Sequence, residues 1–424
     1  MKTNQNKTTE FLVPLLIVMS LMFFWNLSRN INDVLIPHLK RACQLTDFQS
    51  SLVQSAFFGA YFLVALPSGW YIQKKGYRAG MVTGLLISAV GACLFFPAAE
   101  TRIYPLFLTA LFVMAAGFVL LEVTASPYIT KLGSPDGASS RLSLSSAVGS
   151  IGATLAPYLA SLILLHEKDI EQETINSFSA SQLQTFLSAE ADLVKLPYLI
   201  LAGFLTVMAL ALVFIKLPSI KEEDDNQVEK RSLKNIFRFR HTLYGVGAEF
   251  FYVGAEVGIV SFIIRYSKWL NLPGLTEKKA ALFITAFMGL VLIGRLAGTY
   301  VLKKFNPATV LIWCSCGAFL MVLTTILSEG YFSLVCLASV GFFTSVIYPI
   351  IFSLSIKDLG SYTKTASSIF ILGIVGGAII PPIMGYVSDS FGIKYSFIAP
   401  LVCYSYLLFF ALKGHTVKIT KIES

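Results

Sequence analysis

The sequence predicts an all-α integral membrane protein in which twelve transmembrane helices form two parallel, pseudo-symmetric six-helix bundles. Three observations predict this fold. Hydrophobic residues make up 55% of the 424 positions and charged residues only 13%. Long apolar runs recur along the whole chain, and short sequence features repeat between its two halves. Soluble proteins contain roughly 25% charged residues, so this chain has too little polar surface to fold in water.

The individual spans follow from the length of each apolar run, since a membrane helix needs about 20 residues. We expect six helices near residues 11–37, 48–72, 79–99, 104–131, 141–165 and 196–216, and six near 241–266, 280–302, 308–328, 331–357, 364–389 and 394–412. The first run is long and lacks a small-residue cleavage site, so it should remain as a helix rather than be removed as a signal peptide.

The longest polar segment, 217–240, divides the predicted helices six and six. We therefore expect an N-terminal bundle over 1–216, a cytoplasmic linker over 217–240 and a C-terminal bundle over 241–424. If both termini are cytoplasmic, the cytoplasmic side holds 21 lysines and arginines and the opposite side 10. The positive-inside rule favours this orientation, and it accounts for the net charge of +9 without a nucleic-acid partner.

The loop over 166–195 lies on the opposite side in this arrangement. Ser179 is followed three residues later by Gln182, a capping-box pattern that predicts the start of a short surface helix.

Several function classes lack their sequence signatures. The six cysteines and four histidines form no metal-ligand or disulfide pattern. The chain contains no phosphate-binding glycine loop with its lysine, and no nucleophile elbow. We therefore expect no metal, no cofactor, no ATP-driven transport and no enzyme activity.

Two groups of residues repeat between the halves. Gly69, Lys74 and Lys75 recur 229 positions later as Gly298, Lys303 and Lys304. Gly149, Gly152 and Pro157 recur 224 positions later as Gly373, Gly376 and Pro381. Parallel repeats of this kind are typical of transporters that bind substrate between their halves near the middle of the bilayer.

The first predicted helix carries a polar stripe. Asn26, Arg29, Asn30 and Asp33 occupy positions i, i+3, i+4 and i+7, so they share one face. Charged groups inside membrane helices usually line cavities, because each costs roughly 2.5 to 3.5 kcal/mol at a helix centre. The alternative is an internal Arg29–Asp33 pair that only locks the helix.

The fourth helix carries Glu122 among apolar residues, with Ser126 one turn later and then Pro127. A carboxylate that moves between buried and hydrated surroundings can take up and release a proton, which proton symport requires. The alternative is a structural hydrogen bond to a neighbouring helix.

Other polar groups in spans are candidates for substrate contact. Tyr252 and Glu256 share a face of the seventh helix with Glu249, and Gln54 and Tyr61 lie one heptad apart on the second. Ordinary packing is the alternative for Gln54 and Tyr61. Arg295, near the repeated Gly298, fits a structural role at the cytoplasmic side better than contact with substrate.

Six segments carry a resemblance to a known family. The chain resembles the major facilitator superfamily, and within it the fucose/galactose/glucose proton-symporter family, of which the bacterial L-fucose permeases are most similar. The segments are NDVLIPHLK (32–40), QSAFFGAYFLVALPSGW (54–70), FFPAAE (95–100), LEVTASPY (121–128), FYVGAEVG (251–258) and YPIIFSLSIKDLG (348–360).

The resemblance implies uptake of a neutral sugar across a bacterial inner membrane, with Asp33 and Glu122 as the proton-coupling pair and Asn30 beside the sugar. The chain departs from the family at Ser126, Ser146 and Gly149, where amide side chains are usual. We expect Ser126 and Ser146 to contact substrate in their place. An unpaired Arg29 would instead suit an anionic sugar such as a uronate.

We therefore expect a monomeric transporter that imports a monosaccharide with protons, its partners being the sugar, protons and membrane lipid. L-Fucose is the first expectation. The alternatives are another hexose, an N-acetylhexosamine or a uronate, or an uncoupled facilitator or a membrane sugar sensor.

Overall fold

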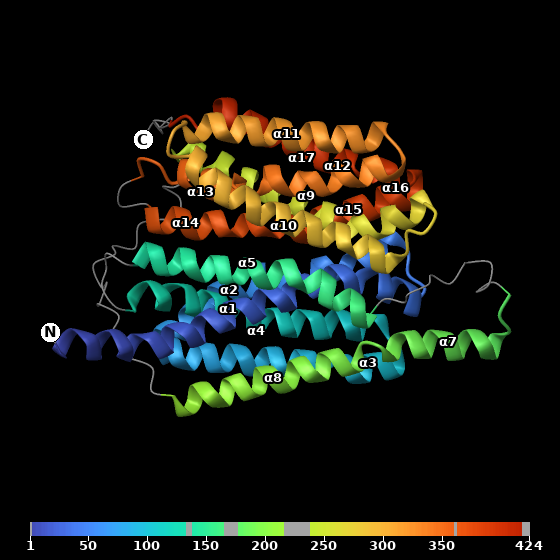
Figure 1. Cartoon of the computed structure of the whole chain (residues 1–424), viewed down its shortest axis with the longest axis horizontal. Coiled ribbons are helices and arrows are strands. Elements are labelled where there is room, and N and C mark those ends of the chain that lie inside the picture. The colour runs from blue at the N-terminus through green and yellow to red at the C-terminus, as the bar shows by residue number, and fades with distance from the viewer. Residues whose placement is uncertain (1, 133–137, 165–176, 216–237, 360–362, 418–424) are drawn as a thin grey trace. The chain divides into compact units, whose positions relative to one another are not determined.

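The structure is a computed structural model that describes residues 2–132, 138–164, 177–215, 238–359 and 363–417 (Figure 1). Every regular element within these ranges is helical. Among the described residues, twelve segments, from Pro14–Ala42 to Ile393–Gly414, are long and apolar enough to cross a membrane. The protein is therefore a multi-pass membrane protein, and the predicted all-α fold with twelve transmembrane helices is confirmed.

The chain divides into two compact units. Unit 1 comprises Met1–Leu45 and Ala56–Glu222, and unit 2 comprises Thr46–Ser55 and Glu223–Ser424. The beginning of the second span therefore belongs with the C-terminal half of the sequence. Residues 216–237, which include most of the predicted linker, lie outside the described residues.

Unit 1 contains the N-terminal spans. Its helices are α1 (Lys2–Ala42), α2 (Asp47–Cys93, from Ala56 onward), α3 (Phe95–Thr101), α4 (Tyr104–Lys131), α5 (Ala138–Leu164), α7 (Ala180–Asp192) and α8 (Lys195–Phe214). The second and third spans are joined within α2 by a sharp kink at Gly76, whose φ of 79° is readily adopted only by glycine.

Unit 2 is built around α9 (Arg240–Leu270), the most buried of the candidate spans (Figure 1). The surrounding helices are α10 (Glu277–Val301), α11 (Pro307–Leu327), α12 (Gly330–Thr344), α13 (Ile347–Ser355), α14 (Thr363–Ile371), α15 (Gly376–Phe391), α16 (Ile393–Ser396) and α17 (Ile398–Phe409), with short turns at Leu372–Val375 (η4) and Phe410–Gly414 (η5). All of these contact α9, and α11 does so where the Tyr266 hydroxyl of α9 donates to the Thr325 carbonyl at 3.4 Å.

The observed helices differ from the predicted ones mainly in continuity. The tenth span is divided into α12 and α13, and the eleventh into α14, η4 and α15. Hydropathy does not detect these interruptions because the residues at each break are themselves apolar. The first helix also extends beyond its predicted limits of 11 and 37, to Lys2 and Ala42.

The repeated glycine pair has the same packing role in both units. A Cβ atom on Gly149 would lie 2.5 Å from Asn26 Nδ2, and one on Gly152 would collide with the Phe23 carbonyl, so α5 packs directly on α1. In unit 2, a Cβ on Gly373 would lie 2.7 Å from Glu249 Cβ. Small residues allow membrane helices to approach this closely.

The remaining members of the repeats do not all share a role. A Cβ on Gly376 would collide with the Phe250 carbonyl, which completes the close contact with α9. A Cβ on Gly298 would meet Val346, whereas the space around Gly69 is open. The Gly69 and Gly298 repeat therefore does not mark an equivalent contact in the two units.

The predicted capping box at α7 is confirmed. The Ser179 hydroxyl accepts the Gln182 backbone N–H at 3.3 Å, and the Ser179 N–H donates to Gln182 Oε1 at 2.9 Å. Further along α7, the buried Glu190 carboxylate lies 3.4 Å from both His38 Nδ1 and Arg41 Nε of α1. These contacts fix the surface helix to unit 1.

Candidate functional site

Three helices of unit 1 meet at Glu122 of α4. The Tyr61 hydroxyl on α2 donates a hydrogen bond to the Glu122 carboxylate. Tyr61 in turn accepts a hydrogen bond from Trp25 Nε1 on α1, at 3.0 Å. A buried carboxylate is tolerated among apolar residues only when donors or cations compensate its charge. The indole and phenol therefore form a directed pair of donors that ends on Glu122.

Arg29 brings a positive charge to the same group. Its guanidinium carbon lies 5.2 Å from the ring centre of Phe58 and 6.0 Å from that of Trp25. The charge acts on Glu122 and on Tyr61. Arginine is suited to this position because its flat, weakly hydrated cation stacks on aromatic faces. The structure thus brings the predicted residues Arg29, Tyr61 and Glu122 together.

The two asparagines of the α1 stripe are engaged with their own helix. Asn26 Nδ2 donates to the Met22 carbonyl at 2.9 Å, and Asn30 Nδ2 donates to the Asn26 carbonyl at 2.8 Å. Asn26 also faces Gly149 of α5. These contacts occupy the amide nitrogens, and they hold both side chains close to the α1 backbone.

Asp33 lies one helical turn after Arg29 on α1 and is 8% exposed. Its neighbour Asn32 is 1% exposed, and neither of its amide atoms has a hydrogen-bond partner among the described residues. Asn32 lies off the polar stripe and was not predicted as a site residue. The sequence signal for Asn32 was its position next to Asp33 within a predicted span. A buried amide there normally needs a hydrogen-bond partner.

The other residues predicted for the N-terminal half are less closely grouped. Gln54 is buried and belongs to unit 2. Ser146 is exposed on α5. The side chain of Ser126 lies outside the part of the chain that the structure describes.

Unit 2 contains a second polar group on α9. The Tyr252 hydroxyl donates to the Glu256 carboxylate, and the charges of Glu249 and of Arg295 on α10 also act on Tyr252. The charge of Glu256 also acts on Tyr404 of α17. The Tyr404 hydroxyl has no hydrogen-bond partner among the described residues. Tyr252 and Glu256 were predicted on one helix face, whereas Tyr404 was not predicted.

These features define the chain as a membrane transporter rather than an enzyme, with carboxylates and their donors placed inside apolar helices. Comparison with known proteins agrees. Residues 18–374 match the model of the Major Facilitator Superfamily. Since the match spans most of the chain, this protein belongs to the major facilitator superfamily.

Relatives align over nearly the whole chain. A glucose/galactose transporter of Brucella abortus biovar 1 (strain 9-941) is 38% identical over 394 residues, 93% of this chain and 92% of the relative. The L-fucose-proton symporter of Escherichia coli (strain K12) is 36% identical over 411 residues, 96% of this chain and 94% of the relative.

Solved structures show the same fold. The transporter FucP in its outward conformation is 37% identical, with a TM-score of 0.70 over 95% of this chain and 98% of that chain. An inward-facing bacterial homologue of the lysosomal transporter Spinster has a TM-score of 0.75 over 96% of this chain and 97% of that chain, at 13% identity. The latter likeness concerns the fold alone.

Proposed function

We propose that this protein imports a neutral monosaccharide together with protons by alternating access. The observation that carries the proposal is the group around Glu122, in which one partly buried carboxylate has a phenolic donor from α2 and a nearby cation from α1. Relatives named as glucose/galactose transporters and as L-fucose-proton symporters support a sugar substrate and proton coupling. Glu122 and Asp33 are the proposed proton-coupling residues.

Glu122 can couple a proton to transport through the balance of charges around it. Ionised, it compensates Arg29; protonated, it leaves the guanidinium without that compensation. A proton that binds Glu122 therefore changes which conformations of α1, α2 and α4 are favourable. Movement of these helices between two accessible states then exchanges the proton with one side of the membrane or the other.

The charge of Arg29 bears on the class of substrate. Because Arg29 and Glu122 are close enough for their charges to interact, the site already contains an anion for this cation, and an anionic sugar is not required to balance it. This favours a neutral hexose or deoxyhexose over a uronate. Named relatives divide between glucose/galactose and L-fucose, and L-fucose remains our first expectation.

The sugar contacts are proposed to come from both halves. In this proposal Asn26, Asn30, Tyr61, Ser126 and Ser146 act with Gln54, Tyr252 and Glu256, because hydroxyls, amides and carboxylates are the groups that bind sugar hydroxyls. The bundles over 1–216 and 241–424, joined by 217–240, are the proposed moving bodies. We further propose a monomer in a bacterial inner membrane with both termini cytoplasmic.

The test is uptake into proteoliposomes of radiolabelled L-fucose, galactose, glucose, N-acetylglucosamine and glucuronate, with and without an imposed proton gradient. For one proton per sugar, one pH unit supports at most about tenfold accumulation. Accumulation of one sugar that collapses with an uncoupler supports symport. Equilibration without accumulation would indicate a facilitator, binding without movement a sensor, and accumulation of glucuronate alone an anionic substrate.

Glu122→Gln tests the coupling role in the same assay. We expect gradient-driven accumulation to fall to equilibrium while exchange of labelled for unlabelled sugar continues. Glu329→Gln is a matched control, because Glu329 pairs with Lys394 at 3.4 Å on an exposed surface. Accumulation by Glu122→Gln at the level of the unmodified protein would show that Glu122 is not the coupling residue.

A further inference from the structure

The helix contacts of α9 in unit 2 repeat those of α1 in unit 1. A Cβ atom on Gly149 of α5 would lie 2.5 Å from Asn26 Nδ2 of α1. A Cβ atom on Gly373 of η4 would lie 2.7 Å from Glu249 Cβ of α9. The two glycines are 224 positions apart in the sequence, and their partners are 223 positions apart. Asn26 and Glu249 therefore occupy equivalent places in the two units.

Each of these helices carries a carboxylate seven residues beyond the glycine contact. Asp33 follows Asn26 on α1, and Glu256 follows Glu249 on α9. Seven residues make almost two full turns, so each carboxylate lies on the face of the contact and about 10 Å further along the helix. Glu256 is therefore the counterpart in unit 2 of Asp33, one of the two proposed proton-coupling residues.

The groups around Glu256 are of the same kinds as those around Glu122. The Tyr252 hydroxyl donates a hydrogen bond to the Glu256 carboxylate, and the charge of Arg295 of α10 acts on that tyrosine. Glu122 likewise has a phenolic donor and a nearby guanidinium. Each unit thus combines a carboxylate, a phenol and a guanidinium within its membrane spans.

The charges near Tyr252 favour a proton on one carboxylate. Two carboxylates and one guanidinium act on Tyr252, those of Glu249, Glu256 and Arg295. One bound proton balances these three charges, and a balanced group costs less inside a membrane. Glu249 is 3% exposed and packs on Gly373, whereas Glu256 is partly exposed. Because proton exchange requires contact with water, Glu256 is the better placed of the two.

Tyr404 of α17 offers a second polar atom beside Glu256. Its side chain is fully buried, and its hydroxyl has no hydrogen-bond partner among the described residues. The charge of Glu256 acts on it, as does that of an ionised Cys403. A buried hydroxyl without a partner costs free energy. Ionised Glu256 can only accept hydrogen bonds, whereas protonated Glu256 can also donate one, and the Tyr404 oxygen can accept it.

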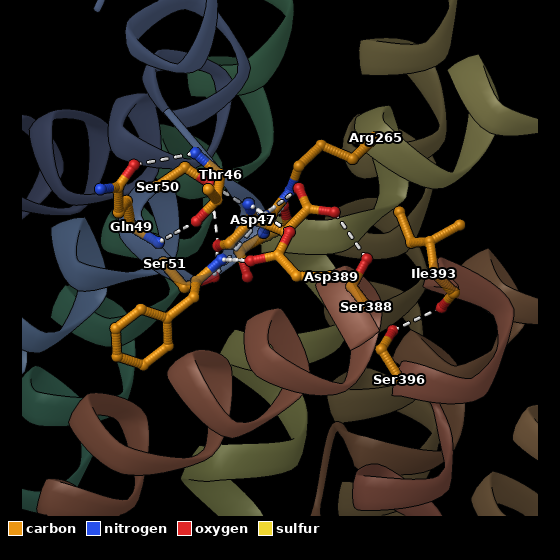
Figure 2. A network of polar contacts seen from close by, with 12 residues as sticks. Thr46, Asp47, Gln49, Ser50, Ser51, Arg265, Ser388, Asp389, Ile393 and Ser396 are labelled. Atoms are coloured by element: carbon orange, nitrogen blue, oxygen red, sulfur yellow. Dashed lines mark hydrogen bonds and ion pairs between the residues drawn. The ribbon is translucent and has the colours of Figure 1, made fainter. Parts of the chain in front are cut away.

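Other charged side chains on α9 and the helices packed against it have different contacts or positions. Arg265 Nη1 of α9 donates to Asp47 Oδ1 at 3.2 Å, and Asp389 Oδ1 of α15 accepts the Asp47 backbone N–H at 2.8 Å (Figure 2). The remaining described ones lie near the ends of α9, α10 and α15 or in the short elements α16 and η5. Among the described side chains, the charges that face Tyr252 are thus the three named above.

We propose that Glu256 is a second proton-binding site, located in unit 2, and that the proton it binds is carried in addition to those coupled through unit 1. Glu256 binds this proton as a carboxylic acid and releases it as a carboxylate. The inference rests on the proton symport proposed above. It deepens the role of Glu256 as a sugar contact, since a carboxyl that binds a sugar hydroxyl can also exchange a proton.

The first experiment measures the number of protons carried per sugar in proteoliposomes. Vesicles are preloaded with the sugar that the uptake panel identifies, and the inward proton gradient is increased until net sugar flux is zero. The ratio is an equilibrium quantity, so it does not depend on how fast a variant transports. We expect Glu256→Gln to lower it by one, which reduces the accumulation supported by one pH unit about tenfold.

Glu329→Gln is the control for this measurement, because Glu329 pairs with Lys394 at 3.4 Å on an exposed surface and should not alter the ratio. An unchanged ratio in Glu256→Gln would overturn the second site.

The second experiment needs no transport, and it decides the question if Glu256→Gln does not carry sugar. Infrared spectra of the purified protein are recorded between about pH 4 and pH 9, since a protonated carboxyl has a C=O band that a carboxylate lacks. We expect Glu256→Gln to lack one titrating carboxyl of the unmodified protein, and Glu249→Gln to retain it. Identical titrating bands in Glu256→Gln and the unmodified protein would show that Glu256 does not exchange a proton.

Tyr404→Phe tests the proposed acceptor in the same spectra. We expect the midpoint of the Glu256 band to shift by about half a pH unit to one unit, the equivalent of one hydrogen bond to one protonation state. Tyr331→Phe should leave it in place, because the Tyr331 hydroxyl donates to the Pro273 carbonyl on an exposed surface. An unmoved midpoint in Tyr404→Phe would exclude Tyr404 from the site.

The two proposals can fail separately. Absence of proton-driven sugar uptake by the unmodified protein counts against the proposed function, whereas the infrared result bears on Glu256 alone.

Discussion

Trp25 Nε1 donates a hydrogen bond to the Tyr61 hydroxyl at 3.0 Å, linking α1 to α2 beside Glu122. Because the indole can only donate, it fixes the direction of the pair, and the phenolic proton is directed to the carboxylate. A change at either aromatic residue should therefore affect the proposed proton-coupling group while Glu122 itself is left in place.

Tyr61→Phe removes the phenolic oxygen between Trp25 and Glu122. We expect a loss of about 1.5 to 3 kcal/mol of stability, as for other hydrogen bonds to charged groups, and a weaker dependence of uptake on external pH. Thermal unfolding and a pH profile of uptake measure these effects. Tyr331→Phe is the control, since its hydroxyl donates to the Pro273 carbonyl on an exposed surface. Equal behaviour of the two variants would contradict the role of Tyr61.

Arg29 and Glu122 should be energetically coupled. Arg29→Gln leaves the partly buried Glu122 carboxylate without a nearby cation and should destabilise the protein, whereas Arg29→Gln with Glu122→Gln removes both charges and should recover part of the loss. Residues that interact directly show coupling of about 0.5 to 3 kcal/mol in such cycles. Unfolding in detergent with both single variants measures it. Additive effects would mean that the two charges act independently.

Gly152 should tolerate no side chain, because a Cβ atom there would collide with the Phe23 carbonyl of α1. We expect Gly152→Leu to cost about 1 to 3 kcal/mol or more through overpacking, and to lower the yield of folded protein. Gly203→Leu provides the comparison, since nothing lies within 4 Å of a Cβ on Gly203. Size-exclusion chromatography and thermal unfolding distinguish them, and comparable stability would argue against close α1–α5 packing.

Cys43 should react slowly with thiol reagents at neutral pH. Burial raises the pKa of its thiol to about 11, an effect that the charge of Arg102 partly offsets. The reactive thiolate is therefore scarce below this pKa, and the labelling rate should rise about tenfold per pH unit toward pH 11. Mass spectrometry of labelled protein measures this. In the unfolded chain the ordinary thiol pKa returns, so denaturant should abolish the difference.

Much of the fold was predictable because the bilayer constrains each membrane-spanning helix separately. Each span was identifiable from its length, since a helix must satisfy its own backbone inside lipid. The α7 capping box and the glycine pairs at 149 and 152 and at 373 and 376 were likewise visible as short patterns. Charged residues within spans are informative because placing a charge inside a membrane helix costs free energy. Arg29 and Glu122 were identified for this reason.

The partners of these residues were decided by tertiary structure. Arg29 could have been assigned to Asp33 by helical spacing, yet the folded chain sets it beside Glu122, 93 positions away in the sequence. Arg265 lies at the end of the predicted span 241–266 and was not predicted as a site residue, although it is buried against Asp47 from a distant helix.

The sequence by itself thus determined which segments enter the membrane and which charges they carry, because both follow from hydropathy and backbone geometry along one helix. Only the tertiary structure decided which charges meet, and that Thr46–Ser55 pack with unit 2. Such choices depend on side-chain packing between helices that are remote in the chain, and no local pattern encodes it.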